Sequence, residues 1–111
     1  MLDKGNPPII DVIKYGKQLS NLIFKHAIEV NGLIKKRSKN WDFDRITLID
    51  KLILRMALVE MIYVDEVPPK VSIAEGVEIA KQFSTEDSSS FINGILDAVY
   101  NEIVKKKENA V

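Results

Sequence analysis

Residues 47–64 read TLIDKLILRMALVEMIYV, and apolar side chains occupy nearly every position of this stretch. The run is too long for a typical strand, and Pro68 and Pro69 follow it, where they cannot continue a helical hydrogen-bond ladder. A helix that is apolar on all sides is normally buried among other helices. We therefore predict a helix over 47–64 at the centre of a helical bundle.

Other helices are expected on both sides of this stretch. Apolar residues recur at three- and four-residue steps over 8–28 and 88–106, and shorter helices are expected over 31–38 and 72–83. Ser72 and Glu75 have the spacing of a capping box, which would begin the helix at Ser72. Gly94 lies inside a helical pattern, where glycine costs about 1 kcal/mol relative to alanine, so close helix packing is its expected role. The sequence thus predicts an all-α fold, a compact bundle of about five helices around a buried central helix.

Bulk properties restrict the classes of protein that fit. A chain of 111 residues is long enough for one core, so we expect a single domain over 1–111. Sixteen Lys and Arg balance sixteen Asp and Glu, so no overall field draws the chain toward nucleic acid or membrane. The apolar window Leu52–Val64 is shorter than the roughly 20 residues that span a bilayer. The absence of cysteine fits a reducing cytoplasm.

The sequence contains no pattern that indicates catalysis. His26, the only histidine, has Glu29 three residues on, and two ligands are too few for a specific metal site. Glu75 and Glu78 share a helix but read more simply as a cap and a solvated charge. Residues 88–90 are serines without a nucleophile elbow, and no phosphate-binding glycine loop is present. We therefore expect no enzyme activity, no cofactor and no metal.

One dense basic cluster precedes the central stretch. It reads Lys35-Lys36-Arg37-Ser38-Lys39. Such a cluster is able to contact RNA phosphates, but it is also typical of a solvated helix end, where cations are favoured by the helix dipole. The residues alone leave both interpretations open.

Three blocks of the chain match one family pattern in order and spacing. The first contains Asn40-Trp41, Asp44-Arg45-Ile46, residues 49–57 and Glu60. The second contains residues 67–71 with Ile73, Glu75, Val77, Glu78, Ala80 and Lys81, and the third is Phe91-Ile92-Asn93-Gly94-Ile95-Leu96-Asp97. Over about 40–99 the chain thereby resembles the NusB family of transcription antitermination factors, whereas residues 15–39 agree mainly in their apolar period.

The resemblance implies an RNA-binding adaptor. NusB proteins are all-helical and bind boxA-type RNA together with ribosomal protein NusE, acting on the transcription elongation complex during ribosomal RNA synthesis. In the family the start of the last helix touches RNA, which implies roles here for Asp87, Ser88, Ser90 and Phe91. Phe91 would offer a face for base stacking, or it is a core aromatic residue at the head of its helix.

The resemblance also implies a protein partner site. Asp44 and Asp50 match family positions near the NusE contact. The alternative for both is capping and a favourable charge near a helix N-terminus.

Two departures from the family pattern carry expectations. The family has an arginine-rich helical pair ahead of the region that begins here near Tyr15, where this chain has only residues 1–14, and Gly76 stands where many relatives carry alanine. Without the pair, an apolar face would be uncovered, which predicts self-association or pairing with a separately encoded segment, and RNA binding weaker than is usual for the family.

Two other functions are compatible with the sequence. One is a helical protein-interaction or oligomerisation module without strong RNA binding, and the other is a detached NusB-like domain of an RNA cytosine methyltransferase. The preferred RNA sequence and the oligomeric state do not follow from the residues.

Overall fold

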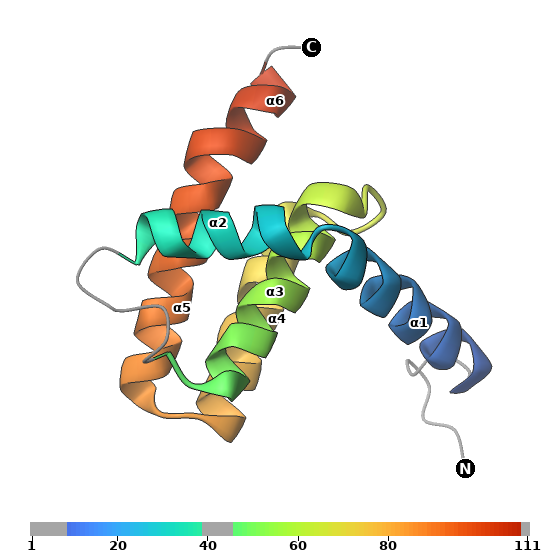
Figure 1. The fold of residues 1–111 in the computed structure, drawn as a ribbon, viewed down its shortest axis with the longest axis horizontal. Helices are drawn as coiled ribbons and strands as arrows, with labels where there is room; N and C mark the ends of the chain where they lie inside the picture. The colour runs from blue at the N-terminus through green and yellow to red at the C-terminus, as the bar shows by residue number, and fades with distance from the viewer. Residues whose placement is uncertain (1–8, 39–45, 110–111) are drawn as a thin grey trace.

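The computed structural model describes residues 9–38 and 46–109, and over these ranges it contains helices and no strand. The helices are α1 (Ile9–Lys25), α2 (Ala27–Arg37), α3 (Leu48–Tyr63), α4 (Pro69–Phe83), α5 (Glu86–Val99), the π-helical turn η2 (Tyr100–Val104) and α6 (Lys105–Asn109). In Figure 1, α3 and α4 lie side by side, α2 crosses the bundle, and α5, η2 and α6 form one continuous rod. The all-α prediction is confirmed.

The core of the bundle is built around α3. Leu54, Leu58 and Val59 of α3 are fully buried. They belong to one apolar cluster with residues of α2, α4 and α5. The prediction of a buried central helix is therefore confirmed. One face of α3 is nevertheless open to solvent, because Leu48, Ile49, Leu52 and Met56 are each more than two fifths exposed.

The helix α4 packs closely against its neighbours at Gly76. A methyl group added there would lie 3.3 Å from Ala57 Cβ on α3 and 3.3 Å from Leu96 Cδ1 on α5. The same addition at Gly94 would meet nothing within 4 Å. The expectation that Gly94 serves close packing is therefore wrong, and Gly76 has that role.

Three helix starts differ by two or more residues from the sequence prediction. The helix α2, predicted over 31–38, begins at Ala27. The helix α4 begins at Pro69, because proline suits the first helical position, and Ser72 lies inside it, buried, with its hydroxyl donating to Glu60 at 2.9 Å. The predicted capping box at Ser72 is therefore wrong. The helix α5 begins at Glu86, two residues before the predicted start, because Thr85 caps it by accepting a hydrogen bond from the Ser88 backbone N–H at 3.0 Å.

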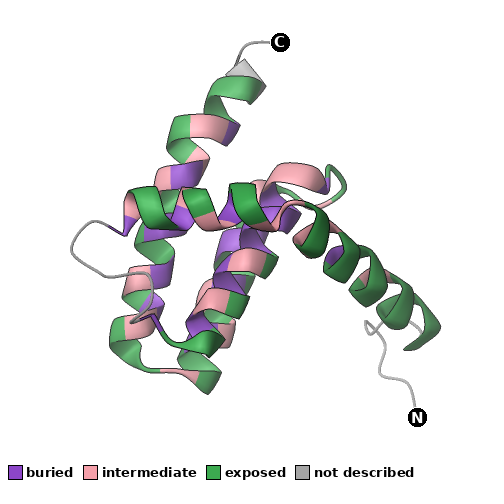
Figure 2. Cartoon of the chain, viewed as in Figure 1, coloured by how far each residue is buried: buried purple, intermediate pink, exposed green. Residues whose placement is uncertain are grey.

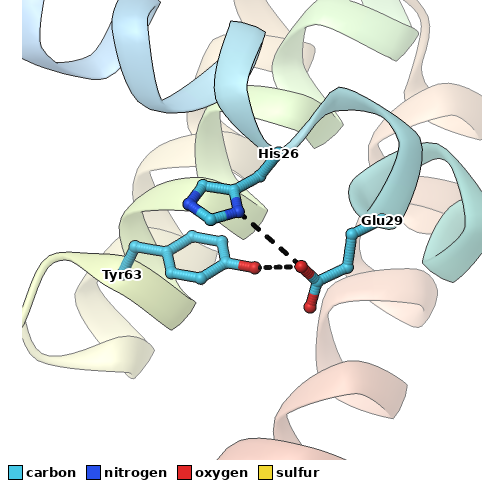
Figure 3. Close-up of polar contacts among 3 residues, drawn as sticks. All are labelled: His26, Glu29 and Tyr63. Carbon is cyan, nitrogen blue, oxygen red and sulfur yellow. Dashed lines mark hydrogen bonds and ion pairs between the residues drawn. The ribbon is translucent and has the colours of Figure 1, made fainter.

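The predicted helix over 8–28 is shorter, because the backbone breaks at His26. The imidazole of His26 stacks on the ring of Tyr63 at the end of α3, with centroids 3.8 Å apart (Figure 3). The Tyr63 hydroxyl donates to Glu29 Oε2 at 2.6 Å, and His26 Nδ1 lies 3.7 Å from the same oxygen. Burial, followed by this bond to Glu29, raises the pKa of Tyr63 to about 12. The three side chains fasten the α1–α2 corner to α3.

The helix α1 projects from the bundle, and most of its surface is exposed (Figure 2). Of its residues, only Leu19 is classed as buried. A second attachment is polar, since the Tyr15 hydroxyl donates to Glu60 Oε2 at 2.5 Å. None of the helices that the structure describes is long and apolar enough to cross a bilayer.

Candidate functional site

A hollow of about 290 Å³ opens where the start of α3 meets the start of α5. Among the described residues, its lining comes from two segments far apart in the sequence and includes Ile46, Thr47, Asp50, Thr85, Asp87, Ser88 and Phe91. Four of these residues, Asp50, Asp87, Ser88 and Phe91, are among the site residues that the family resemblance implied. The hollow is therefore the first candidate for a functional site.

Two capped helix N-termini form the walls of this hollow. Thr47 precedes α3 in an extended conformation, and its hydroxyl accepts from the Asp50 backbone N–H at 3.2 Å. Thr85 has the same role at α5, where it accepts from the Ser88 N–H. Because threonine side chains satisfy otherwise unpaired backbone donors, both helices begin at fixed residues. The positive ends of two helix dipoles consequently face the same space.

Asp50 forms part of the floor of the hollow. Its side chain is buried, with a relative exposure of 4%, and its Oδ1 accepts from the Ser84 hydroxyl at 3.0 Å. That bond links the first turn of α3 to the connection between α4 and α5. Asp50 lies in the first turn of α3, where the helix dipole favours a negative charge, but the side chain that caps this helix is that of Thr47. Asp44 lies outside the described residues, so its predicted partner role stays a prediction.

Phe91 combines the two interpretations that the sequence left open. Its ring is half-buried, packs against the apolar core and also lines the hollow. Asp87 and Ser88 lie one turn before it on α5. Ser90 is exposed and does not line the hollow. The structure thus groups Asp87, Ser88 and Phe91, and it separates Ser90 from them.

The basic cluster does not form one solvated surface. Lys35 and Lys36 are exposed, but the Arg37 side chain is only 8% exposed, and its Nη2 lies 2.6 Å from Glu102 Oε2. Arg37 also donates to the Leu33 carbonyl at 3.2 Å. Arg37 therefore ties α2 to η2, a role that neither sequence interpretation included.

A second polar site lies under α1, and the sequence analysis did not find it. The Glu60 carboxylate on α3 accepts from Tyr15 of α1 and from Ser72 of α4. Burial and the nearby Glu60 raise the pKa of Glu75 above its ordinary value. Glu60 could have indicated this polar site, because it is a charged residue inside the most apolar run of the sequence. A buried charge requires partners.

Metal binding finds no support in the described parts of the chain. Over residues 9–38 and 46–109, no three His, Asp or Glu side chains gather in an arrangement that would hold an ion. Glu29 and His26, the pair that the sequence offered, are instead engaged with Tyr63.

The sequence and the fold match a known family of helical proteins. The model of the NusB family matches residues 10–101, so the match includes α1 and α2 as well as the three blocks in the central and C-terminal parts. The chain belongs to the NusB family.

The similar proteins include a curated antitermination factor and solved structures. The transcription antitermination protein NusB of Chloroherpeton thalassium is 47% identical over 89 residues, which are 80% of this chain and 42% of that protein. The chain therefore spans about two fifths of the length of this relative. The structure of T. maritima NusB superposes with a TM-score of 0.82 and 28% identity, covering 99% of this chain and 76% of that one. A chain in a structure titled "Crystal Structure of a Plectonemic RNA Supercoil" has a TM-score of 0.78 and 26% identity, covering 94% of this chain and 71% of that one.

Proposed function

We propose that this protein acts in transcription antitermination as an adaptor without enzyme activity, in the cytoplasm where transcription takes place. In this role it binds boxA-type RNA together with ribosomal protein NusE and so joins the transcription elongation complex. The observation that carries the proposal is the 47% identity, over 80% of this chain, with a transcription antitermination protein. The hollow between α3 and α5 supports it, because it groups three of the residues implied in RNA contact.

In this proposal the two partners meet neighbouring parts of the surface. The start of α5 contacts RNA through Asp87, Ser88, Ser90 and Phe91, and the approach to α3 at Asp44 and Asp50 contacts NusE. A base stacked on the Phe91 ring would contribute about 1–3 kcal/mol. The formal net charge of zero supplies little sequence-independent attraction, so we expect RNA binding weaker than about 1 µM at physiological salt.

Titration of a boxA-type oligonucleotide over a range of salt concentrations tests the RNA part of the proposal. For a single strand, each phosphate neutralised adds about 0.7 to the magnitude of the slope of log K against log salt. We expect a slope that corresponds to only a few phosphate contacts. Sub-micromolar affinity at physiological salt would contradict the weak-binding expectation. Absence of binding to RNA both alone and with NusE, together with no retention of NusE in a pull-down, would contradict the adaptor function.

Exposed apolar side chains favour a second candidate, a protein-interaction or oligomerisation module without strong RNA binding. On α1, Ile9, Ile10, Val12 and Ile13 are each more than half exposed, and the open face of α3 adds Leu48. Exposed apolar patches of several hundred Å² usually mark an interaction surface. Light scattering at micromolar concentration separates the candidates when combined with the RNA titration, since the module would associate and leave RNA unbound.

A further inference from the structure

We propose that two copies of this chain form a dimer in which the exposed start of α1 of each copy lies on the open face of α3 of the other. This inference goes beyond the proposed adaptor function and does not depend on RNA binding. It follows from the exposure, the spacing, the direction and the charges of the two helices. The α1 face consists of Ile9, Ile10 and Ile13, and the α3 face consists of Leu48, Ile49, Leu52 and Met56.

The two faces are both apolar and exposed, and they are similar in spacing. All residues of the α1 face are more than half exposed, and all residues of the α3 face are more than two fifths exposed. The α1 face occupies positions i, i+1 and i+4 of its helix, and the first three residues of the α3 face repeat that spacing. Residues at these positions lie on one side of a helix, so each helix presents one apolar face to solvent.

The direction of α1 keeps the two faces of one chain apart. Leu19 is the buried anchor of α1, and the Tyr15 hydroxyl donates to Glu60 in the C-terminal half of α3. Because these contacts hold α1 at that half of α3, the start of α1 lies well away from the start of α3 (Figure 1). The α1 face therefore leaves the α3 face of its own chain open.

The area of the two faces suits a second copy of the chain. Together the faces expose on the order of 800 Å² in each chain, which is about what each partner buries in a standard interface. In a two-fold dimer the α1 face of each copy covers the α3 face of the other. The same contact made twice then covers both faces of both copies, and the assembly is closed.

The charges beside the two faces are complementary. Lys17 is exposed and lies one turn after the α1 face, while Glu75 and Met56 line the same hollow between α1, α3 and α4. Among the described residues, neither Lys17 nor Glu75 forms an ion pair. A parallel arrangement that brings the starts of the two faces together also brings Lys17 opposite the partner's Met56, because each lies eight positions after the first residue of its face. The ammonium group would then face the partner's Glu75.

A helix of a different protein is the main competing occupant. Any amphipathic helix with a few exposed aliphatic side chains would cover the α3 face. Such a helix would leave the α1 face exposed, however, whereas a second copy covers both faces at once. The presence of two matching faces on one chain therefore favours self-association.

Sedimentation velocity of the full chain over a range of concentrations tests the inference. We expect a dimer with a dissociation constant of about 10–100 µM, at the weak end for an interface of this size, because each helix contributes only three or four apolar side chains. Well below this concentration the single chain predominates, and comparisons of the stability of α1 apply to it.

The substitution Ile10→Asp should weaken the dimer at least about tenfold, because it removes an apolar side chain from the interface twice in each dimer. Ile28→Asp is the matched control, since Ile28 is also an exposed isoleucine at the second position of a helix and lies outside both faces. This control should leave the dissociation constant unchanged. Circular dichroism of both variants checks that their helix content equals that of the parent.

Two charge reversals test the parallel arrangement at low salt. Lys17→Glu and Glu75→Lys should each weaken the dimer by about two- to tenfold, because each breaks an exposed ion pair that occurs twice. The two substitutions combined should restore the affinity of the parent chain. A purely structural effect of either substitution would not be reversed by the other.

A chain that stays monomeric at several hundred micromolar would overturn the inference, also where a helix of another protein covers the α3 face. Equal effects of Ile10→Asp and Ile28→Asp, or a charge-reversed double variant no better than the single ones, would overturn it as well. None of these results touches the adaptor function. Loss of RNA and NusE binding by the parent chain would overturn that function and leave the dimer in place.

Discussion

The helices α1 and α5 have similar apolar periodicity, yet they end up in different environments. On α5, Ile92, Leu96 and Val99 are fully buried between neighbouring helices. On α1, Ile9 and Ile13 are 74% and 51% exposed, and the helix extends away from the bundle (Figure 2). Periodicity therefore shows that a helix has an apolar face, but it does not show what covers that face.

The two regions are also held by different kinds of interaction. The bundle of α3, α4 and α5 depends on close apolar packing, including the approach at Gly76. The helix α1 has Leu19 as its buried anchor, and polar contacts from Tyr15 and at His26 add to it. Substitutions in the bundle should consequently cost more stability than equivalent substitutions in α1.

The largest difference is expected between Leu58→Ala in α3 and Ile13→Ala in α1. Leu58 is fully buried, so the loss of its side chain leaves a cavity and should lower the free energy of unfolding by about 2–5 kcal/mol. Ile13 is half exposed, and its truncation should change stability by less than about 0.5 kcal/mol. Urea denaturation followed by circular dichroism measures both. Equal losses would show that α1 is packed as tightly as the bundle.

The next effect concerns the two glycines. Gly76→Val should destabilise the protein by about 1–3 kcal/mol, because its side chain would push α4 away from Ala57 and Leu96. Gly94→Val, with open space around it, should stay within about 0.5 kcal/mol of the parent, since valine is a somewhat better helix former than glycine. Thermal denaturation of the pair tests this, and a larger loss at Gly94 would contradict the packing described for Gly76.

A smaller effect is expected from the polar attachment of α1. Tyr15→Phe removes a donor from the buried Glu60 carboxylate and should cost about 1–2 kcal/mol. Tyr63→Phe is the control, and it should cost less than about 1 kcal/mol because its acceptor, Glu29, is exposed to solvent. If Tyr15→Phe left stability unchanged, the contact with Glu60 would not hold α1.

The smallest effect concerns alkaline pH. Burial and the bond to Glu29 raise the pKa of Tyr63 to about 12, above the value near 10 of an unfolded tyrosine. A raised pKa in the folded state stabilises the protein fully below about pH 10, and this contribution is lost as pH rises toward about 12. Stability measured by urea denaturation should therefore fall through this window, and less so in Tyr63→Phe. An identical pH profile in that variant would contradict the prediction.

These comparisons also show which parts of the fold the sequence can predict. The apolar run at 47–64 was sufficient to predict a buried central helix. Local sequence patterns gave wrong predictions where tertiary contacts determine the start of a helix or the role of a side chain. Ser72 has capping-box spacing, but Pro69 begins α4 and Ser72 turns to the buried Glu60. The family resemblance pointed to Gly76 as a departure from alanine, but only the packing of α4 shows that a side chain there would meet α3 and α5.

The individual residues of the candidate site could be predicted from the sequence, but their grouping around one hollow could not. The resemblance named Asp50, Asp87, Ser88 and Phe91 from separate segments. Their convergence on one hollow depends on how α3 packs against α5, which the spacing of residues along the chain does not encode. For the same reason the sequence could not show that the neighbouring Ser90 lies outside the hollow.

Mapping of backbone amide NMR shifts during RNA titration tests most directly whether the bundle, and not α1, carries the RNA site. We predict that the signals of 46–50 and 85–91 move together and saturate, while those of Ile9–Lys25 stay in place. Shifts confined to α1 or to the lysines at 35–36, with the hollow between α3 and α5 unchanged, would contradict the account.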